Sequence, residues 1–298
     1  MASAVAATRA IDRRDRQFGY LMAAPALFAL LLIILFPILF ALYTSAFDYT
    51  LMHPVHDDFV GLDHYGSALG DQQFRLSLWV TLRFVAAVVI LEFLIGFTVA
   101  LMLNAVERGK NVYYLILLFP LLMNPVVVGL IWRMFLHPVL GIVNYLLSTI
   151  GIGAVNWLGD PSNAFWTLVL VDIWHQVSFM IVLLLAGLSA LPREPYEAAR
   201  MEGASTLQTF IHVTLPLMRP VIMVTLLIRL IFAVRTYDLI YIMTRGGPGQ
   251  ATDLVSYFIY RQAFVTLNIA QASAMAVILL LIVLTLTAYL HRYMRSLV

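Results

Sequence analysis

Six long apolar segments, separated by shorter polar ones, run the length of this chain. Each holds the roughly 20 apolar residues that a helix needs to cross a bilayer. The runs are continuous and much longer than the strands of about 10 residues that build membrane barrels. The pattern therefore predicts an all-α integral membrane protein with six transmembrane helices, at about 20–46, 78–103, 112–136, 164–190, 217–243 and 271–291.

The composition leaves little room for anything outside the membrane. Of the 298 residues, 62% are hydrophobic and 11% are charged, whereas a soluble domain carries about 25% charged residues. We expect 1–19 to form a cytoplasmic N-terminal tail and 20–295 to form one six-span domain. The first apolar segment is too long for a signal-peptide core, so we expect it to be retained. The absence of cysteine excludes disulfides and thiolate metal sites, and the scattered basic residues indicate no nucleic-acid partner.

The distribution of Lys and Arg predicts the orientation, because cytoplasmic connections carry an excess of these residues. An even number of spans puts both chain ends on one side. That side holds eleven basic residues, namely Arg9, Arg13, Arg14, Arg16, Arg108, Lys110, Arg193, Arg200, Arg219, Arg292 and Arg295. The opposite side holds three, namely Arg75, Arg245 and Arg261. Both termini and the 191–216 connection are therefore predicted to be cytoplasmic.

The 191–216 connection has the signals of two short helices separated by a break. Pro195 suits a first helical turn, where its missing N–H costs nothing. The acidic Glu194 and Glu197 also favour the start of that helix, because its N-terminal end carries partial positive charge. Gly203 can adopt the left-handed conformation that ends a helix. This pattern predicts a first helix that ends just before Gly203.

The second short helix begins with a capping box. Ser205 is followed three residues later by Gln208, the spacing at which each side chain bonds the other's backbone N–H. We expect Leu215-Pro216 to end this helix, because proline interrupts helical hydrogen bonding. Two small helices held between membrane spans are typical of a docking element, although an ordinary amphipathic loop has the same signals.

Seven ionisable residues fall within or near the predicted spans, where a charge facing lipid is costly. They are Arg83, Glu92, Arg133, Asp172, Arg229, Arg235 and Asp238. Arg235 and Asp238 are three apart and could pair on one helix face, and His175 could hydrogen-bond Asp172. One interpretation is structural pairing. The other is a polar solute pathway formed by Asp172, His175, Arg229, Arg235 and Asp238, in which Arg229 and Arg235 donate to a hydroxylated or anionic solute.

Two further patterns leave alternatives open. Pro120 and Pro125 in the third span favour either a packing kink or a broken helix that lines a pathway. The first external loop, 48–77, holds His53, His56 and His64 near several aspartates. Their spacing matches no metal-ligand motif, so we interpret the loop as solvated and predict no metal site.

Recognisable catalytic chemistry is missing from the sequence. No GxxxxGK[ST] motif occurs, and the single lysine, Lys110, follows no phosphate-binding glycine pattern. No HExxH or GxSxG motif occurs either. We therefore expect no catalytic residues, no ATP hydrolysis by a P-loop mechanism and no cofactor bound by this chain.

The cytoplasmic connection resembles the EAA loop of ABC importer permeases, the segment that docks on the cytoplasmic ATPase. The match comprises Glu197-Ala198-Ala199, then Gly203, then Val213-Thr214-Leu215-Pro216. Valine at 213 stands where that family usually has isoleucine. The resemblance implies ATPase-coupling roles for Glu197, Ala198, Ala199, Met201, Gly203, Leu207, Phe210 and Pro216, with Met201, Leu207, Phe210 and Ile211 as the apolar docking surface.

A second stretch resembles the signature of the maltose-type, carbohydrate branch of that family. Tyr237–Pro248 is similar to FD-x-IY-x-LT-x-GGP, with tyrosine replacing phenylalanine at 237 and methionine replacing leucine at 243. Further similarity at 129–133, 141–144 and 272–274 extends the resemblance over nearly all of 20–295. The implied fold is a six-span type I importer permease with cytoplasmic coupling helices.

The resemblance also implies partners. They are a second, non-identical six-span permease, two copies of an ATPase subunit that bind ATP and Mg²⁺, and a periplasmic or lipid-anchored solute-binding protein. The implied location is a bacterial inner membrane, and the implied solute is a sugar or sugar derivative. An importer of another solute, a stand-alone secondary transporter and a membrane enzyme are the alternatives.

Overall fold

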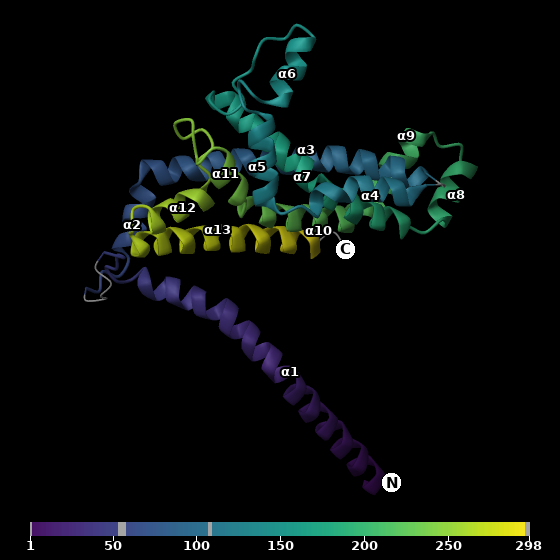
Figure 1. Ribbon diagram of the computed structural model, residues 1–298. Coiled ribbons are helices and arrows are strands. Elements are labelled where there is room, and N and C mark those ends of the chain that lie inside the picture. Colours follow the sequence, from purple (N-terminus) through teal and green to yellow (C-terminus); the bar gives the residue numbers. More distant parts are fainter. Residues whose placement is uncertain (1, 53–57, 107–108, 296–298) are drawn as a thin grey trace.

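The computed structural model describes residues 2–52, 58–106 and 109–295, and these residues are helical with connecting loops (Figure 1). The α-helices are α1 (Ala2–Thr44), α2 (Asp63–Gly70), α3 (Gln72–Ala105), α4 (Lys110–Leu121), α5 (Pro125–Phe135), α6 (Ile142–Thr149), α7 (Pro161–Ser189), α8 (Glu194–Met201), α9 (Thr206–Thr209), α10 (Leu215–Val234), α11 (Asp238–Met243), α12 (Val255–Phe264) and α13 (Ile269–Arg295). A π-helical turn spans Phe210–Thr214. Within the described ranges the single β feature is an isolated bridge between Phe47 and Phe59. The all-α prediction is confirmed.

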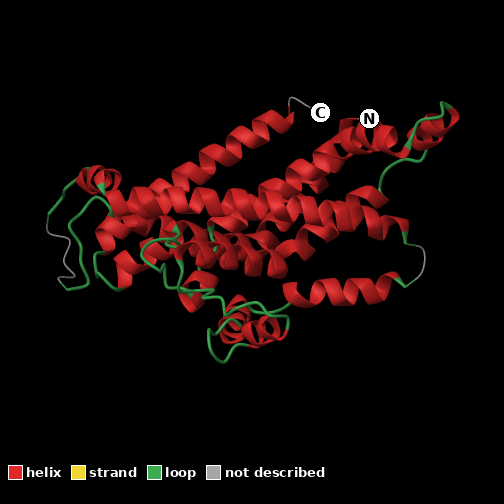
Figure 2. Ribbon diagram, turned by 90° about the horizontal axis from the view of Figure 1, so that it is seen from above, coloured by secondary structure: helices red, strands yellow, loops and turns green. Residues whose placement is uncertain are grey.

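The helices that could cross a membrane match the six predicted segments. Five are long and apolar enough by themselves, and α4 with α5 makes the sixth when this pair, which is bent by 91°, is counted as one span. The long helices α3, α7, α10 and α13 run side by side in one general direction, with most loops at the two ends of the bundle (Figures 1 and 2). The α8–α9 connection lies at one end and α2 at the other (Figure 1). The outer ends of α1 and α13 both lie toward the α8–α9 end and away from α2 (Figure 1).

The prolines of the third span allowed either a packing kink or a broken helix, and the structure has the broken helix. Residues 122–124 separate α4 from α5, and Pro125 occupies the first turn of α5. Asn124 caps that helix, since its side-chain oxygen accepts from the Val126 N–H at 2.9 Å. The cap and the proline together start a new helix, which explains why the axis turns sharply here.

The fifth span is also interrupted, which the sequence pattern did not predict. α10 ends at Val234 and α11 begins at Asp238. The Arg235 N–H bonds the Phe232 carbonyl in a tight final turn. The intervening residues therefore leave helical geometry at the point where the polar side chains of this span occur.

α1 stands apart from the other helices. It runs away from the bundle and approaches it only toward its C-terminal end (Figure 1), where Thr44 Oγ1 donates to Ser273 Oγ at 3.0 Å. No residue in its most apolar stretch is buried within the chain. Residues 2–17, which include most of the predicted N-terminal tail, continue the helix of the first span.

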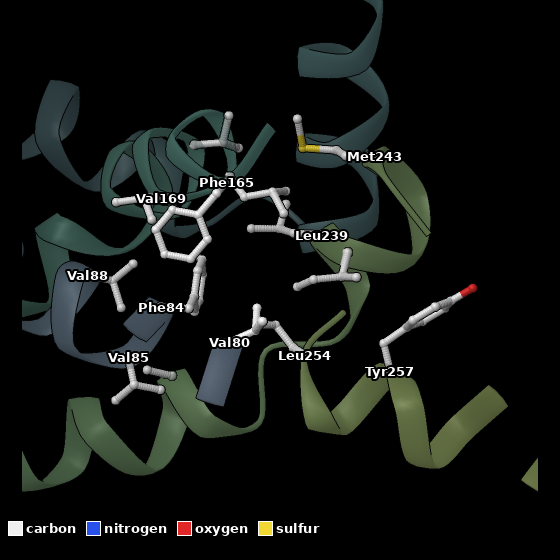
Figure 3. Close-up of a cluster of buried hydrophobic side chains, with 14 of the residues drawn as sticks. Val80, Phe84, Val85, Val88, Phe165, Val169, Leu239, Met243, Leu254 and Tyr257 are labelled. Carbon is white, nitrogen blue, oxygen red and sulfur yellow. The ribbon is translucent and has the colours of Figure 1, made fainter. Parts of the chain in front are cut away.

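The main buried core lies between α3, α7 and the α11–α12 region. Phe84 and Phe165 face each other edge-to-face with ring centroids 6.5 Å apart (Figure 3). Closer to the α8–α9 end, Gly96 of α3 packs directly on Met180 of α7. Small residues at such contacts let helix backbones approach closely, which is how helices associate within lipid. α3 and α7 thus form a tightly packed pair against which α10 is placed.

Candidate functional sites: a coupling loop and a polar cavity

The first half of the 191–216 loop has the predicted local geometry. Pro195 lies in the first turn of α8, and Gly203 has a φ of +76°. The Ala204 N–H bonds the Ala199 carbonyl at 2.9 Å, and the Gly203 N–H bonds the Arg200 carbonyl at 3.1 Å. This bonding is the glycine-dependent helix ending expected from the sequence. The positions predicted for Pro195 and Gly203 are confirmed.

The second half starts as predicted but continues further. Gln208 N–H donates to Ser205 Oγ at 3.3 Å, and Ser205 N–H donates to Gln208 Oε1 at 2.8 Å, which completes the capping box. The predicted stop at Leu215-Pro216 is wrong. The Leu215 N–H reaches back five residues to the Phe210 carbonyl, and Pro216 lies in the first turn of α10.

The π turn explains how the helix passes this proline. Proline cannot donate a backbone hydrogen bond, and in a regular helix its ring meets the preceding turn. The wider i→i+5 turn at Phe210–Thr214 precedes the ring and relieves that crowding. The helical path consequently runs from α9 through the π turn into α10, so the loop is a direct extension of the fifth span.

The side chains of the loop divide into exposed and anchored groups. Met201 is 89% exposed and Leu207 is 66% exposed, and Glu197 and Ala198 are also exposed while Ala199 is buried. Phe210 corrects the predicted docking surface, because its ring packs on Phe97 of α3 with centroids 5.8 Å apart. Tyr196 donates to Thr214 Oγ1 at 3.1 Å and ties α8 to the π turn.

Glu197 lies beside a cavity of about 570 Å³ where α8 meets the ends of α3 and α7. Arg193 and Arg200 also line this cavity. Among the described residues, Glu197 forms no ion pair with either arginine. The carboxylate at the start of α8 is thus available to a group from outside the chain.

Three of the seven intramembrane ionisable residues form a buried cluster, the ion triad of Glu92, Asp172 and Arg229. Arg229 Nε and Nη2 bond the two oxygens of Glu92, with Nη2 to Oε1 at 2.8 Å, and Nη2 also bonds Asp172 Oδ2. Each of the three residues is at most 2% exposed. The triad joins α3, α7 and α10, which is the structural pairing that the sequence allowed.

The triad changes the prediction for Arg229. Its guanidinium is enclosed by two carboxylates and does not line the neighbouring cavity, so it is not placed to donate to a solute in this conformation. Two carboxylates also outnumber the one guanidinium within the triad.

The other predicted pathway residues meet at a cavity of about 220 Å³, termed here the polar cavity. Its lining residues come from α5, α7 and the α10–α11 interruption, and include Asp172, His175, Arg235 and Asp238. The wall is completed by Pro125, Gln176, Phe232, Thr236, Tyr237 and Leu239. The broken third and fifth spans therefore meet at one site, with polar groups on its wall.

Two predicted pairings within this group are wrong. Arg235 and Asp238 form no ion pair within the described chain, because the helix is interrupted between them and does not hold them at the spacing of one turn. His175 bonds the Met123 carbonyl at 3.1 Å and Gln176 at 3.0 Å rather than Asp172. The Met123 carbonyl lies in the break of the third span, so His175 satisfies a backbone group that the break exposed.

The two remaining intramembrane arginines have local partners. Arg83 lies over the Phe165 ring at 4.9 Å, and Arg133 Nη1 donates to the Ile242 carbonyl at 2.9 Å. Sequence reasoning missed Gln176 and Tyr237 as cavity residues. Gln176 follows Asp172 by one helical turn, a spacing that signals a shared face.

The GGP-containing loop between α11 and α12 has its own buried acid. Asp253 is 2% exposed, and its Oδ2 accepts from Arg261 Nη2 at 2.6 Å. Burial raises the pKa of Asp253, and the Arg261 charge opposes that rise. A Cβ at Gly246 would lie 2.9 Å from Asp253 Oδ1, and Gly246 has a φ of +82°. Glycine at this position thus lets the loop close over the carboxylate.

Metal-binding geometry does not occur within the described residues, where no group of three or more His, Asp or Glu side chains could hold an ion. His64 bonds the Phe47 carbonyl at 3.2 Å. His53 and His56 lie outside the described residues, as does Arg108 from the orientation count, so the predictions for these residues stay predictions.

Comparison with known proteins decides the family. Residues 92–296 match the model of the binding-protein-dependent transport system inner membrane component. The chain belongs to this family. The matched region includes the 191–216 loop, the residues that line the polar cavity and the whole ion triad. All three features therefore lie within the family domain.

Relatives match the permease over almost its full length. It is 36% identical to the trehalose/maltose transport system permease protein MalF of Thermococcus litoralis, over 94% of each chain. It is 34% identical to the sulfoquinovosyl glycerol transport system permease protein SmoG of Agrobacterium fabrum, over 97% of this chain and 94% of that protein. These relatives confirm the predicted resemblance to the carbohydrate branch.

A solved structure supports the fold independently. One chain in the crystal structure of a bacterial ABC transporter for the acidic polysaccharide alginate superposes with a TM-score of 0.84 and 24% identity, covering 96% of this chain and 97% of that one. A related crystal structure contains that transporter in complex with its alginate-bound periplasmic protein. The six-span importer fold predicted from the sequence is confirmed.

Proposed function

We propose that this permease forms half of the translocation pathway of an ATP-driven, binding-protein-dependent importer of a sugar or sugar derivative. One observation carries the proposal. The second half of the exposed 191–216 loop continues from α9 through the π turn into α10, and α10 ends at the polar cavity. A movement imposed on the loop would therefore reach the cavity along a single helical path. The relatives named for trehalose, maltose and sulfoquinovosyl glycerol support a sugar as the cargo.

The proposed partners follow from the uncovered apolar face of α1 and from the lack of a P-loop in the sequence. α1 exposes an apolar face that its own bundle leaves uncovered, which supports a second permease chain beside it. The sequence has no P-loop, so two copies of a separate ATPase subunit would bind ATP and Mg²⁺ and dock on the loop. A solute-binding protein would deliver the sugar at the opposite end.

The proposed orientation puts both termini and the 191–216 loop in the cytoplasm of a bacterial inner membrane. The charge count supports this orientation, since eleven basic residues lie on that side and three on the other. The outer ends of α1 and α13 also lie toward the α8–α9 end of the bundle. A carboxylate such as Glu197 would there meet an arginine of the ATPase in a charge-assisted hydrogen bond.

The chemistry of the polar cavity fits a hydroxylated solute. Arg235 donates only, Asp238 accepts when ionised, and Gln176 can do both, while Tyr237 adds an aromatic face. Such a mixture can bond sugar hydroxyls in several orientations. Arg235 is the arginine on the cavity wall, and it would favour an anionic sugar over a neutral one.

The pathway role of the cavity predicts a transport defect in Arg235→Ala. A hydrogen bond to a charged group contributes about 1.5–3 kcal/mol, so uptake at low solute concentration should fall by about 10- to 100-fold. Radiolabelled maltose and trehalose would be offered with the binding protein to vesicles that contain the complete assembly. Arg75→Ala, which removes an exposed arginine of α3 outside the cavity, should transport normally. Wild-type uptake by the Arg235→Ala assembly would remove Arg235 from the pathway.

The same vesicles test the proposed function itself. Uptake of either sugar should require ATP, the ATPase subunit and the binding protein together. Uptake that continues without the ATPase subunit would contradict the proposal and favour a stand-alone transporter.

A further inference from the structure

The ion triad lies between the two functional parts of the molecule. Arg229 is on α10, which begins at the coupling loop and ends at the polar cavity. Asp172 is on α7, where it both bonds Arg229 and lines that cavity. Glu92 anchors the other face of the guanidinium on α3. A single side chain of the fifth span thus contacts both members of the tightly packed α3–α7 pair.

The remaining contacts that α10 makes with these two helices are of a different kind. Met218 and Ile222 join an apolar cluster with residues of α3 and α7. The other buried polar residue of α10, Thr225, bonds the Val221 carbonyl of its own helix at 2.8 Å. Within the described chain, the triad supplies the side-chain hydrogen bonds that join α10 to α3 and α7. Apolar contacts allow helices to slide by small amounts, whereas a bidentate guanidinium–carboxylate pair has one favoured geometry.

The triad is also a poor device for stability alone. Burying charges requires their desolvation, and a buried ion pair often contributes no more stability than well-packed apolar residues of similar volume. The triad pairs two carboxyl groups with a single guanidinium. Its directional geometry, rather than its contribution to stability, distinguishes it from the apolar cluster next to it.

We propose that Arg229 is a positioning residue that locks α10 to α3 and α7. Because this lock prevents α10 from sliding along the other two helices, a movement of the coupling loop, residues 191–216, is transmitted to the cavity wall. This inference rests on the proposed function. Asp172 provides the last step of the connection, because its carboxylate is shared between Arg229 and the wall of the cavity. With the lock intact, the three helices move as one body when the ATPase closes.

The test uses a charge-balanced double variant, Glu92→Met with Arg229→Met. It removes one acid and one base, leaves Asp172 at the cavity, and replaces the lock with flexible apolar side chains. Because the natural chain has no cysteine, spin labels at Val224→Cys on α10 and Val182→Cys on α7 report the distance between these helices. Both positions are partly exposed, at 44% and 38%. The distance is measured in the complete assembly without nucleotide and again with ATP and vanadate.

In the otherwise natural assembly, we expect the α10–α7 distance to be the same in both states. In the double variant, we expect the distance to change when ATP and vanadate are added. We also expect the sugar imported per ATP hydrolysed, with radiolabelled maltose or trehalose as the probe, to fall by about tenfold, in the range of coupling between distant sites. Thr225→Val, which removes a buried hydroxyl one turn before Arg229, should behave as the natural chain.

Two results would overturn the lock. One is a change in the α10–α7 distance in the natural assembly, and the other is a double variant that matches the natural assembly in both measurements. If the double variant does not assemble, Arg229→Lys replaces it in the same two measurements, with the same expected results. Lysine keeps the positive charge but cannot bond both carboxylates as a fork. Failure of the proposed function can be distinguished from failure of the lock, because in that case the natural assembly would show no ATP-dependent sugar uptake.

Discussion

Gly203→Asp should abolish transport while leaving the permease inserted and folded. Within this chain the change is tolerable, because an added Cβ at Gly203 meets no atom within 4 Å. The φ of +76° costs a residue with a side chain roughly 1–2 kcal/mol, and aspartate is among the residues that accept this conformation most readily. A loss of transport would therefore come from a partner that packs on the exposed turn between α8 and α9.

A matched control is available on the same predicted side of the membrane. Gly109, at the start of α4, has a φ of +77° and also has open space where a Cβ would lie. Gly109→Asp imposes the same backbone strain and the same charge, but away from the 191–216 loop. We expect this variant to transport at the natural rate, with insertion of both variants checked by membrane fractionation. Normal uptake by Gly203→Asp would remove the coupling role from the turn.

Gly96→Leu should strongly destabilise the folded permease. A Cβ at Gly96 would lie 2.8 Å from Met180 Cβ and 3.5 Å from the Ile181 backbone nitrogen. Both atoms belong to the rigid part of α7, so α3 and α7 would have to separate. Overpacking of a close contact usually costs about 1–3 kcal/mol, and separation of this pair would also disturb the ion triad above it.

Thermal unfolding of the purified assembly measures this effect, together with the yield of intact complex. Gly66→Leu is the control, because Gly66 is exposed on α2 and an added Cβ there meets no atom within 4 Å. That variant should be at least as stable as the natural chain, since leucine favours a helix more than glycine does. An unchanged melting temperature for Gly96→Leu would show that α3 and α7 are not tightly packed.

The features that the sequence predicted correctly depend on local signals. Span length follows directly from the number of consecutive apolar residues, and all six segments reappear, the third as a bent pair. The cap at Ser205 and the turn at Gly203 depend on residues within five positions of each other, so their geometry could be predicted without the fold. Pro125 likewise signalled the break of the third span.

The features that escaped prediction depend on residues far apart in the chain. Arg229 pairs with Glu92, 137 residues away, and with Asp172, 57 residues away, whereas the sequence suggested pairs three residues apart. The direction of Phe210 depends on Phe97 of another helix. The interruption at Arg235–Tyr237 lies inside a segment that is apolar at both ends, so hydropathy alone gave no signal for it.

Purification of the tagged permease from its native membrane in mild detergent is the most direct test of the central claim. Identification of the co-purifying chains should reveal an ATPase subunit in two copies and a second, non-identical six-span permease. These partners would establish the chain as half of an ATP-driven importer, and its binding protein could then be screened for the bound sugar. A permease that purifies alone, or only with copies of itself and no ATPase, would contradict that claim.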